Sequence, residues 1–209
     1  MVQPEDAAIQ LVMFDCDGVM FDTEDANRAY YNHILDHFGA PPLTDPQFDY
    51  VHMHTAQESV DHIFADPETR AAAQAFRLTL SYQPFLQYMR IEPDLKPLID
   101  RIRPPRLTAV ATNRSDTMGR VLETHGLRDY FDMVVTSLDV QHPKPHPESL
   151  VKILRHFDLP ADRSLYIGDS PLDEMAARAA GVPFAAFRNP QLQARWHIDR
   201  LADVVQLPI

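Results

Sequence analysis

The chain lacks the features that mark secreted and membrane proteins. Its single cysteine, Cys16, rules out an intrachain disulfide and favours a reducing compartment. No apolar run approaches the roughly 20 residues that a membrane-spanning helix needs. The acidic segment 1–6 carries no signal-peptide pattern. We therefore expect a cytoplasmic protein.

Positive charge is also scarce. Lysine and arginine number 19 against 30 aspartates and glutamates, which gives a net charge of −11. A surface this acidic offers no electrostatic attraction to nucleic acid or to an anionic membrane, so neither is an expected partner. An anionic substrate would need a local cation to overcome the repulsion, and a divalent metal ion is the natural candidate.

Strand-like and helix-like segments alternate through most of the chain, whose 209 residues suffice for one full domain and a small insert. Strands are expected at 9–14, 107–111, 133–135, 164–167 and 184–187, and helices at 115–126, 147–157 and 171–180. This order predicts an α/β fold, a three-layer Rossmann-like core with helices on both faces of a parallel sheet.

Residues 22–92 interrupt that alternation. They contain no convincing strand, and helices are expected at 23–38, at 55–64 and, as one or two helices, within 67–89. We therefore predict an α/β core of residues 1–21 and 93–209, into which residues 22–92 are inserted as a helical segment.

Polar groups follow four of the expected strands. Asp15 and Asp17 follow the first, and Thr112-Asn113 follows the second. Lys144 lies between two prolines after the third, and Gly168-Asp169-Ser170-Pro171-Leu172-Asp173 follows the fourth. Because the carboxyl ends of parallel strands share one edge of a sheet, these groups are expected to converge on one pocket.

The set is chemically coherent for phosphoryl transfer. A carboxylate can attack phosphorus, but it repels a phosphate dianion unless Mg²⁺ offsets the repulsion. A lysine and a threonine hydroxyl can hold the transferring oxygens, and a second carboxyl group can protonate the leaving alcohol.

In these motifs the chain resembles the haloacid dehalogenase-like hydrolases, in particular the phosphoglycolate phosphatase and β-phosphoglucomutase branch with an α-helical cap. The segment 14–24 resembles the family's first motif, Thr112-Asn113 the second, Lys144-Pro145 the third and 168–173 the fourth. The resemblance covers nearly the whole chain. It implies Mg²⁺ as cofactor and a catalytic core of residues 1–21 and 93–209. It also implies that residues 22–92 are an α-helical cap that closes over the substrate, with hinges near 21–24 and 91–95.

The resemblance also implies residue roles. Asp15 would be the nucleophile that becomes an aspartyl-phosphate, and Asp17 the general acid and then the base that activates water. Thr112 and Lys144 would bind the phosphoryl group. The ligands of Mg²⁺ would be the Asp15 carboxylate, the Asp17 main-chain carbonyl and Asp169, with Asp173 supporting the metal from behind or through a water.

Other positions are candidate substrate contacts. Asn113 would bind substrate beside Thr112, and Arg114 would reach a substrate carboxylate or phosphate, with a solvent-facing arginine as the alternative. His52 and His54 fall in the expected loop between the first two cap helices, where such residues influence substrate choice in the family; the alternative is that both lie on the cap surface. Cys16 departs from the bulky aliphatic residue common between the two aspartates, either as buried filler or as a redox switch.

Several functions remain open at this stage. The leading one is a Mg²⁺-dependent phosphatase of a small phosphorylated metabolite, and the runner-up is a phosphomutase of the β-phosphoglucomutase kind. A non-catalytic phospholigand-binding protein would be expected to have a broken catalytic set, and this set is complete. Dehalogenase activity is disfavoured because it does not need the second acid, Asp17. The physiological substrate, and whether the protein is a monomer or a homodimer, are left undetermined.

Overall fold

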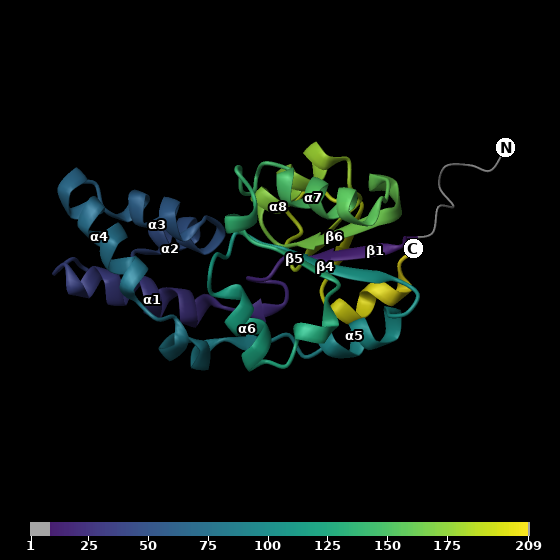
Figure 1. The fold of residues 1–209 in the computed structure, drawn as a ribbon, viewed down its shortest axis with the longest axis horizontal. Helices are drawn as coiled ribbons and strands as arrows, with labels where there is room; N and C mark the ends of the chain where they lie inside the picture. Colours follow the sequence, from purple (N-terminus) through teal and green to yellow (C-terminus); the bar gives the residue numbers. More distant parts are fainter. Residues whose placement is uncertain (1–8, 209) are drawn as a thin grey trace. The chain divides into compact units, whose positions relative to one another are not determined.

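A computed structural model describes residues 9–208, and the acidic segment 1–6 lies outside the described residues. Contacts divide the chain into two compact units (Figure 1). One unit consists of the chain up to Met20 and from Ile91 onward, and the other is Phe21–Arg90. The expected boundaries, 22 and 92, fall within two residues of these.

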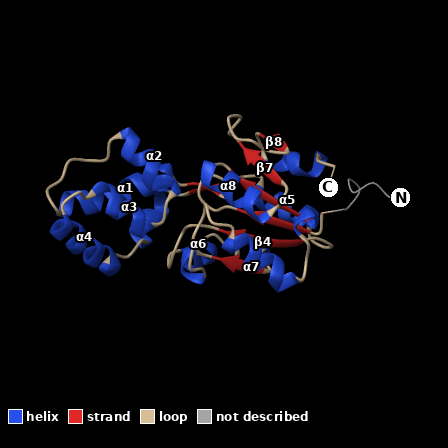
Figure 2. Ribbon diagram, turned by 90° about the horizontal axis from the view of Figure 1, so that it is seen from above, coloured by secondary structure: helices blue, strands red, loops and turns tan. Residues whose placement is uncertain are grey.

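The first unit is built on a six-stranded parallel sheet with the order β5-β4-β1-β6-β7-β8. Its strands, red in Figure 2, are β1 Leu11–Phe14, β4 Leu107–Ala111, β5 Met133–Val135, β6 Ser164–Gly168, β7 Phe184–Phe187 and β8 Trp196–Ile198. The edge strand β8 was not predicted. The two central strands, β1 and β6, are buried along their whole length, as expected for a parallel sheet covered on both faces.

Helices cover both faces of this sheet, which confirms the predicted three-layer α/β core (Figure 1). Side chains alternate along each strand, so that Leu11 and Met13 of β1 share one face. They pack there with Leu150 of α7 and Ala176 of α8 in one buried cluster. The helices of this unit are α5 Leu95–Ile102, α6 Met118–Thr124, α7 Glu148–Phe157 and α8 Pro171–Ala180, with 3₁₀ helices at Arg128–Tyr130, Ser137–Asp139, Ala161–Arg163 and Leu201–Gln206.

Local signals explain where α8 begins and ends. Ser170 caps its N-terminus, because its hydroxyl accepts a hydrogen bond from the main-chain N–H of Asp173 at 3.3 Å. Pro171 occupies the first position, where a missing N–H costs nothing, and Gly181 ends the helix in a left-handed conformation. The expected start of α6 at residue 115 was wrong: the helix begins at Met118 because Asp116 and Thr117 form a turn.

The second unit, Phe21–Arg90, is helical. It contains α1 Glu24–His37, α2 Asp45–Met53, α3 Ala56–Ile63, α4 Pro67–Thr79 and a 3₁₀ helix at Gln83–Tyr88. Helix α2 was not predicted, although Thr44 and Gln47 form a reciprocal capping box at its start. His52 therefore lies in the last turn of a helix rather than in a loop, and His54 is the residue that ends it.

The expectation that residues 22–92 contain no strand was also wrong. Two-residue strands, β2 (Phe21–Asp22) and β3 (Arg90–Ile91), pair with each other as a separate sheet. Strands this short carry no alternating pattern that a sequence could display. Within residues 9–208, no helix is long and apolar enough to cross a membrane.

Candidate active site

The register of the sheet gathers the predicted groups at one edge. Phe14, the last residue of β1, pairs with Val110 of β4 and Ile167 of β6. The three neighbouring strands therefore end together. Asp15, Thr112 and Asp169 follow them, and the Asp15 N–H continues the ladder by donating to the Ile167 carbonyl at 2.9 Å.

Two glycines let the carboxylates approach the main chain closely. Gly18 has a φ of +82°, which favours glycine, and a Cβ placed there would overlap the carboxylate of Asp169. A Cβ on Gly168 would likewise overlap the side chain of Asp173. The glycines of the first and fourth motifs thus make the space in which the acids sit.

Lys144 is the centre of the buried part of the site. Its ammonium donates to Asp15 Oδ1 at 2.7 Å, to Asp173 Oδ1 at 2.6 Å and to the Tyr166 hydroxyl at 3.0 Å. Its side chain is only 3% exposed. All three protons of the ammonium have an acceptor, which is the condition under which a lysine can be buried.

The loop that carries Lys144 is held by Asn113. The Asn113 side-chain amide donates to the Lys144 carbonyl at 3.0 Å, and its oxygen accepts from the Lys144 N–H at 2.9 Å. Both polar ends of the amide are therefore engaged by the main chain of Lys144. The predicted substrate contact of Asn113 stays a prediction, and these bonds favour a role in positioning Lys144.

Asp173 is surrounded by hydrogen-bond donors. Its Oδ1 accepts from Lys144 and from the Tyr166 hydroxyl, each at 2.6 Å. Its Oδ2 accepts from the Ser170 hydroxyl at 2.6 Å, from the Ser170 N–H at 3.1 Å and from the Asp169 N–H at 3.3 Å. Burial raises the pKa of Asp173, but Lys144 and these hydrogen bonds outweigh it and lower the pKa below its usual value.

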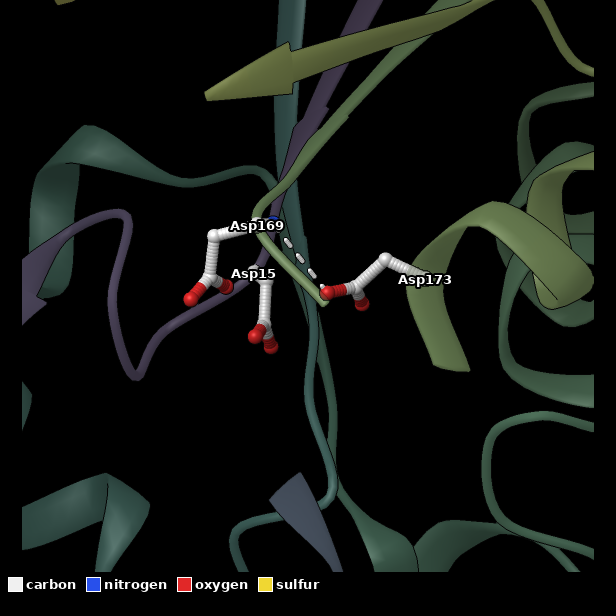
Figure 3. Close-up of side chains that lie close together, drawn as sticks. All are labelled: Asp15, Asp169 and Asp173. Carbon is white, nitrogen blue, oxygen red and sulfur yellow. Dashed lines mark hydrogen bonds between the residues drawn. The ribbon is translucent and has the colours of Figure 1, made fainter. Parts of the chain in front are cut away.

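The pKa values of Asp15 and Asp169 are shifted in the opposite direction from that of Asp173. Carboxylate oxygens of Asp15, Asp169 and Asp173 lie within 4.8 Å of one another, and Figure 3 shows the three side chains converging from the ends of β1 and β6 and the start of α8. Burial, followed by the charges of neighbouring aspartates, raises the pKa of Asp169 well above its usual value. Burial and the nearby Asp173 and Asp17, partly offset by Lys144, raise the pKa of Asp15 to about 7.

This crowding fits a divalent cation. Buried carboxylates that repel one another are stabilised when a hard cation binds between them, and carboxylate oxygens are the ligands that Mg²⁺ prefers. Asp169 is positioned for such a role by Asn189, whose amide donates to the Asp169 carbonyl at 2.8 Å. Asp173 fits less well as a direct ligand, because both of its oxygens already accept strong hydrogen bonds.

Lys144 balances part of the negative charge. Burial alone would lower its pKa, but Asp15 and Asp173 outweigh burial and raise it above the usual value. Lys144 therefore stays protonated at any physiological pH. A fixed positive charge at this point can hold both Asp15 and the oxygens of an incoming anion.

Arg114 and Asp17 form a second ion pair beside the first. The Nε of Arg114 donates to Asp17 Oδ2 at 3.1 Å, and its Nη2 donates to Asp17 Oδ1 at 2.5 Å. The Arg114 side chain is 5% exposed, so the alternative of a solvent-facing arginine does not describe it. Its predicted contact with substrate stays a prediction.

The remaining predicted residues lie as follows. Thr112 is buried between Asn113 and the end of β4, and its hydroxyl accepts from the Arg114 N–H at 3.1 Å. His54 belongs to the helical unit, where its ring stacks on Tyr50 and its Nδ1 lies 2.8 Å from the Tyr50 carbonyl oxygen. The Nδ1 of His52 lies 3.3 Å from the side-chain nitrogen of Asn27. Substrate contact by either histidine stays a prediction.

Cys16, between the two aspartates, is fully buried. Burial, followed by the charge of Asp17, raises the pKa of its thiol well above the usual value. A thiol kept protonated in this way is a poor nucleophile and a poor redox sensor, so the structure favours filler over switch.

The sequence analysis missed Tyr166 and Asn189. Tyr166 sits in the middle of the buried strand β6, and its hydroxyl must find a partner there. That requirement was the available signal, although it does not name Lys144 and Asp173 as the partners. Asn189 follows β7 with no motif around it, and nothing in its sequence context indicated a contact with Asp169.

Comparison with known proteins agrees with this geometry. The family model described as haloacid dehalogenase-like hydrolase matches residues 12–187. The chain is 30% identical over 186 residues to pyrophosphatase PpaX of Bacillus pumilus, covering 86% of this chain and 83% of that one. It is also 30% identical to a phosphoglycolate phosphatase of Chromobacterium violaceum, covering 83% and 82%.

The fold is also similar to that of a solved structure. A crystal structure of a HAD-superfamily hydrolase, subfamily IA, from Geobacter sulfurreducens superposes with a TM-score of 0.79 at 35% identity, covering 97% of this chain and 98% of that one.

Proposed function

This chain belongs to the haloacid dehalogenase-like hydrolase family, and from that premise we propose that it is a Mg²⁺-dependent phosphatase. Its substrate is a small phosphorylated metabolite, and the reaction passes through an aspartyl-phosphate on Asp15. The observation that carries the proposal is the buried ammonium of Lys144, which joins Asp15 at 2.7 Å to Asp173 at 2.6 Å beside Asp169. The proposed nucleophile, its counter-charge and the acids proposed to bind the metal thus lie close together.

Asp15 attacks through its free oxygen. Lys144 binds Oδ1, so Oδ2 is the carboxylate oxygen that has no hydrogen-bond partner among the described residues. In the first step, Oδ2 forms a bond to phosphorus while the bond between phosphorus and the leaving oxygen breaks. In the second step, a water oxygen attacks phosphorus and the Asp15 carboxylate leaves, which regenerates the enzyme.

Asp17 moves the proton in both steps. It enters the first step in its protonated form and gives that proton to the leaving oxygen when the ester bond breaks; the proton that it then takes from the attacking water restores the protonated form. Thr112 and Lys144 hold the oxygens of the phosphoryl group; the Thr112 hydroxyl accepts from Arg114, which leaves its own hydrogen to donate.

The residues that would hold Mg²⁺ are Asp15, Asp169 and the main-chain carbonyl of Asp17. A bound Mg²⁺ would neutralise charge and polarise the phosphoryl group. We place Asp173 behind these ligands, where it fixes Lys144. The opposite pKa shifts of Asp169 and Asp173 support this division, because burial and neighbouring acids dominate at Asp169, whereas Lys144 and hydrogen bonds outweigh burial at Asp173.

The first test is hydrolysis by the purified protein with Mg²⁺. Suitable substrates are p-nitrophenyl phosphate, pyrophosphate, phosphoglycolate and fructose 1-phosphate; pyrophosphate and phosphoglycolate are suggested by the names of the relatives above, and fructose 1-phosphate by the E. coli phosphatase YqaB. Wild type should release phosphate and should show a phosphorylated protein after acid quenching. Asp15→Asn should show neither, while a surface control, Asp162→Asn, should match wild type.

Two results would overturn the proposal. One is full turnover by Asp15→Asn, and the other is no hydrolysis of any substrate in the panel despite Mg²⁺ binding. Conversion of glucose 1-phosphate to glucose 6-phosphate without phosphate release would replace the phosphatase with a phosphomutase.

A further inference from the structure

The pairing of Arg114 with Asp17 is a two-pronged one. Nε and Nη2 of the guanidinium each donate to a different oxygen of the carboxylate, so the two planar groups lie fork to fork. The side chains are 5% and 15% exposed, respectively. An exposed pair of the same chain, Arg128 with Glu123, has side chains that are 63% and 67% exposed and a single contact at 3.3 Å.

Arg114 is itself fixed at both ends. Its Nη1 donates to the Thr117 hydroxyl at 3.2 Å. Its main-chain N–H donates to the Thr112 hydroxyl at 3.1 Å, and its carbonyl accepts from the Ser137 N–H at 3.1 Å. These hydrogen bonds hold the Arg114 guanidinium in place. Asp17, which is 97 residues away in the sequence, accepts hydrogen bonds from it.

We propose that Arg114 is a positioning residue that sets the direction of the Asp17 carboxyl group for proton transfer. The inference rests on the proposed function, in which Asp17 serves the leaving oxygen and then the water. The terminal torsion of an aspartate is broad, so an unattached carboxyl group samples many directions. The fork selects one of them, and proton transfer requires hydrogen-bond reach between donor and acceptor.

The inference predicts different effects for substrates that have different leaving groups. The p-nitrophenolate ion leaves without a proton, whereas the alkoxide of benzyl alcohol needs one. Misplacing Asp17 should therefore damage the first chemical step for benzyl phosphate and spare it for p-nitrophenyl phosphate. kcat/KM reports that step for both substrates, even where hydrolysis of the aspartyl-phosphate limits kcat.

The experiment measures kcat/KM of the full chain with Mg²⁺ on the two esters. For Arg114→Ala we expect a loss of ~100-fold on benzyl phosphate, within the range that acid catalysis contributes, and little loss on p-nitrophenyl phosphate. Arg114→Lys keeps the charge without the fork and should fall between wild type and Arg114→Ala. Equal losses on both esters would overturn the inference and make Arg114 a substrate contact instead.

A double-mutant cycle ties the effect to Asp17. Asp17→Asn should show the same dependence on leaving group, and adding Arg114→Ala to it should cost no further activity on benzyl phosphate. Multiplicative losses would overturn the positioning role. If Asp17→Asn keeps the wild-type kcat/KM on benzyl phosphate, the proposed function of Asp17 is wrong. If only Arg114→Ala keeps it, the inference about Arg114 alone is wrong.

A control variant separates positioning from general damage. Arg103→Ala removes a comparable ion pair of the same unit, in which Arg103 Nη2 lies 2.6 Å from Asp132 Oδ1. It should leave the ratio of the two kcat/KM values at that of wild type. Should Arg114→Ala fail to fold in a thermal unfolding measurement, Arg114→Lys carries the test: a ratio equal to that of wild type would overturn the requirement for the fork.

Discussion

The side-chain amide of Asn113 exchanges two hydrogen bonds with the main chain of Lys144, at 3.0 Å and 2.9 Å. Asn113 thereby forms the two hydrogen bonds that a neighbouring strand would form with the main chain of Lys144. The ammonium of this lysine contacts Asp15. No other residue type supplies one donor and one acceptor in this arrangement, apart from the longer glutamine. These two hydrogen bonds explain how Lys144 keeps its ammonium in a fixed position although it lies in a loop.

Loss of the two hydrogen bonds between Asn113 and Lys144 should slow catalysis. We expect Asn113→Ala to lower kcat by about 10- to 100-fold on every phosphate ester, because Lys144 loses its fixed position beside Asp15. Steady-state kinetics on p-nitrophenyl phosphate would measure the change. The matched control is Asn32→Ala, which removes an asparagine that accepts from the Leu43 N–H at 2.8 Å in the helical unit and should leave kcat intact. A rise in KM with unchanged kcat would favour a substrate contact instead.

Gly18 should tolerate no side chain. Gly18→Ala adds a Cβ where the Asp169 carboxylate lies, at a φ of +82°. We expect Mg²⁺-dependent activity to be lost because Asp169 is displaced. Gly39→Ala is the control, since Gly39 has a φ of +65° with nothing within 4 Å of its Cβ. That variant should bear only the roughly 1–2 kcal/mol cost of the left-handed conformation and stay active. Full Mg²⁺-dependent activity of Gly18→Ala would contradict this geometry.

Mg²⁺ should stabilise the fold more at higher pH. The Asp15 pKa rises from 3.8 to about 7 on folding, so its contribution to the stability of the metal-free protein is present below pH 4 and is lost as pH rises to 7. Mg²⁺ should bind the ionised carboxylate and thereby restore that loss. The increase in Tm on adding Mg²⁺ should therefore be larger at about pH 8 than at about pH 5.5.

Asp15→Asn should reduce this dependence on pH, and the surface variant Asp162→Asn should keep it. Calorimetric titration at neutral pH in two buffers of different ionisation enthalpy would measure the protons released on binding. Equal Tm shifts at both pH values, with no proton release, would show that Asp15 is already ionised before the metal binds.

Removing the Tyr166 hydroxyl should affect the charged groups that contact Asp15. Tyr166→Phe takes one acceptor from Lys144 and one donor from Asp173, while the direct Lys144–Asp173 contact remains. We expect the free energy of unfolding to fall by about 1 kcal/mol, together with a drop in kcat. Tyr82→Phe removes a buried hydroxyl that donates to Asn27 at 2.9 Å in the helical unit. It should cost similar stability and leave kcat unchanged, and an equal effect of both variants on kcat would argue against a role of Tyr166 in the site.

Elements with strong local signals were predicted to the residue. Strands β4 and β5 and helix α8 have the predicted bounds, since an apolar run or a proline and a glycine define their ends. Helix α5 was missed although Leu95, Leu98, Ile99 and Ile102 repeat at helical spacing; its Pro97 lies in the first turn, where proline is tolerated. The edge strand β8 was missed because the polar His197 interrupts its apolar residues, whereas the equally short β5 is a continuous apolar run.

The sequence by itself determined which polar side chains follow the strands of the sheet. Acids, a threonine and a lysine follow buried apolar runs, and a parallel sheet must bring such positions to one edge. These are local properties, and each can be seen within about ten residues of the chain.

Only the tertiary structure decided which of these groups touch. Arg114 contacts Asp17 across 97 residues, Asn113 contacts Lys144 across 31, and Tyr166 contacts Lys144 across 22. The sequence cannot fix such pairs, because a side chain's partner depends on strand order and register, and a shift of one residue would send it to the opposite face of the sheet. For that reason we could propose positioning roles for Asn113 and Arg114, whose contacts with substrate stay predictions, only once their hydrogen bonds were known.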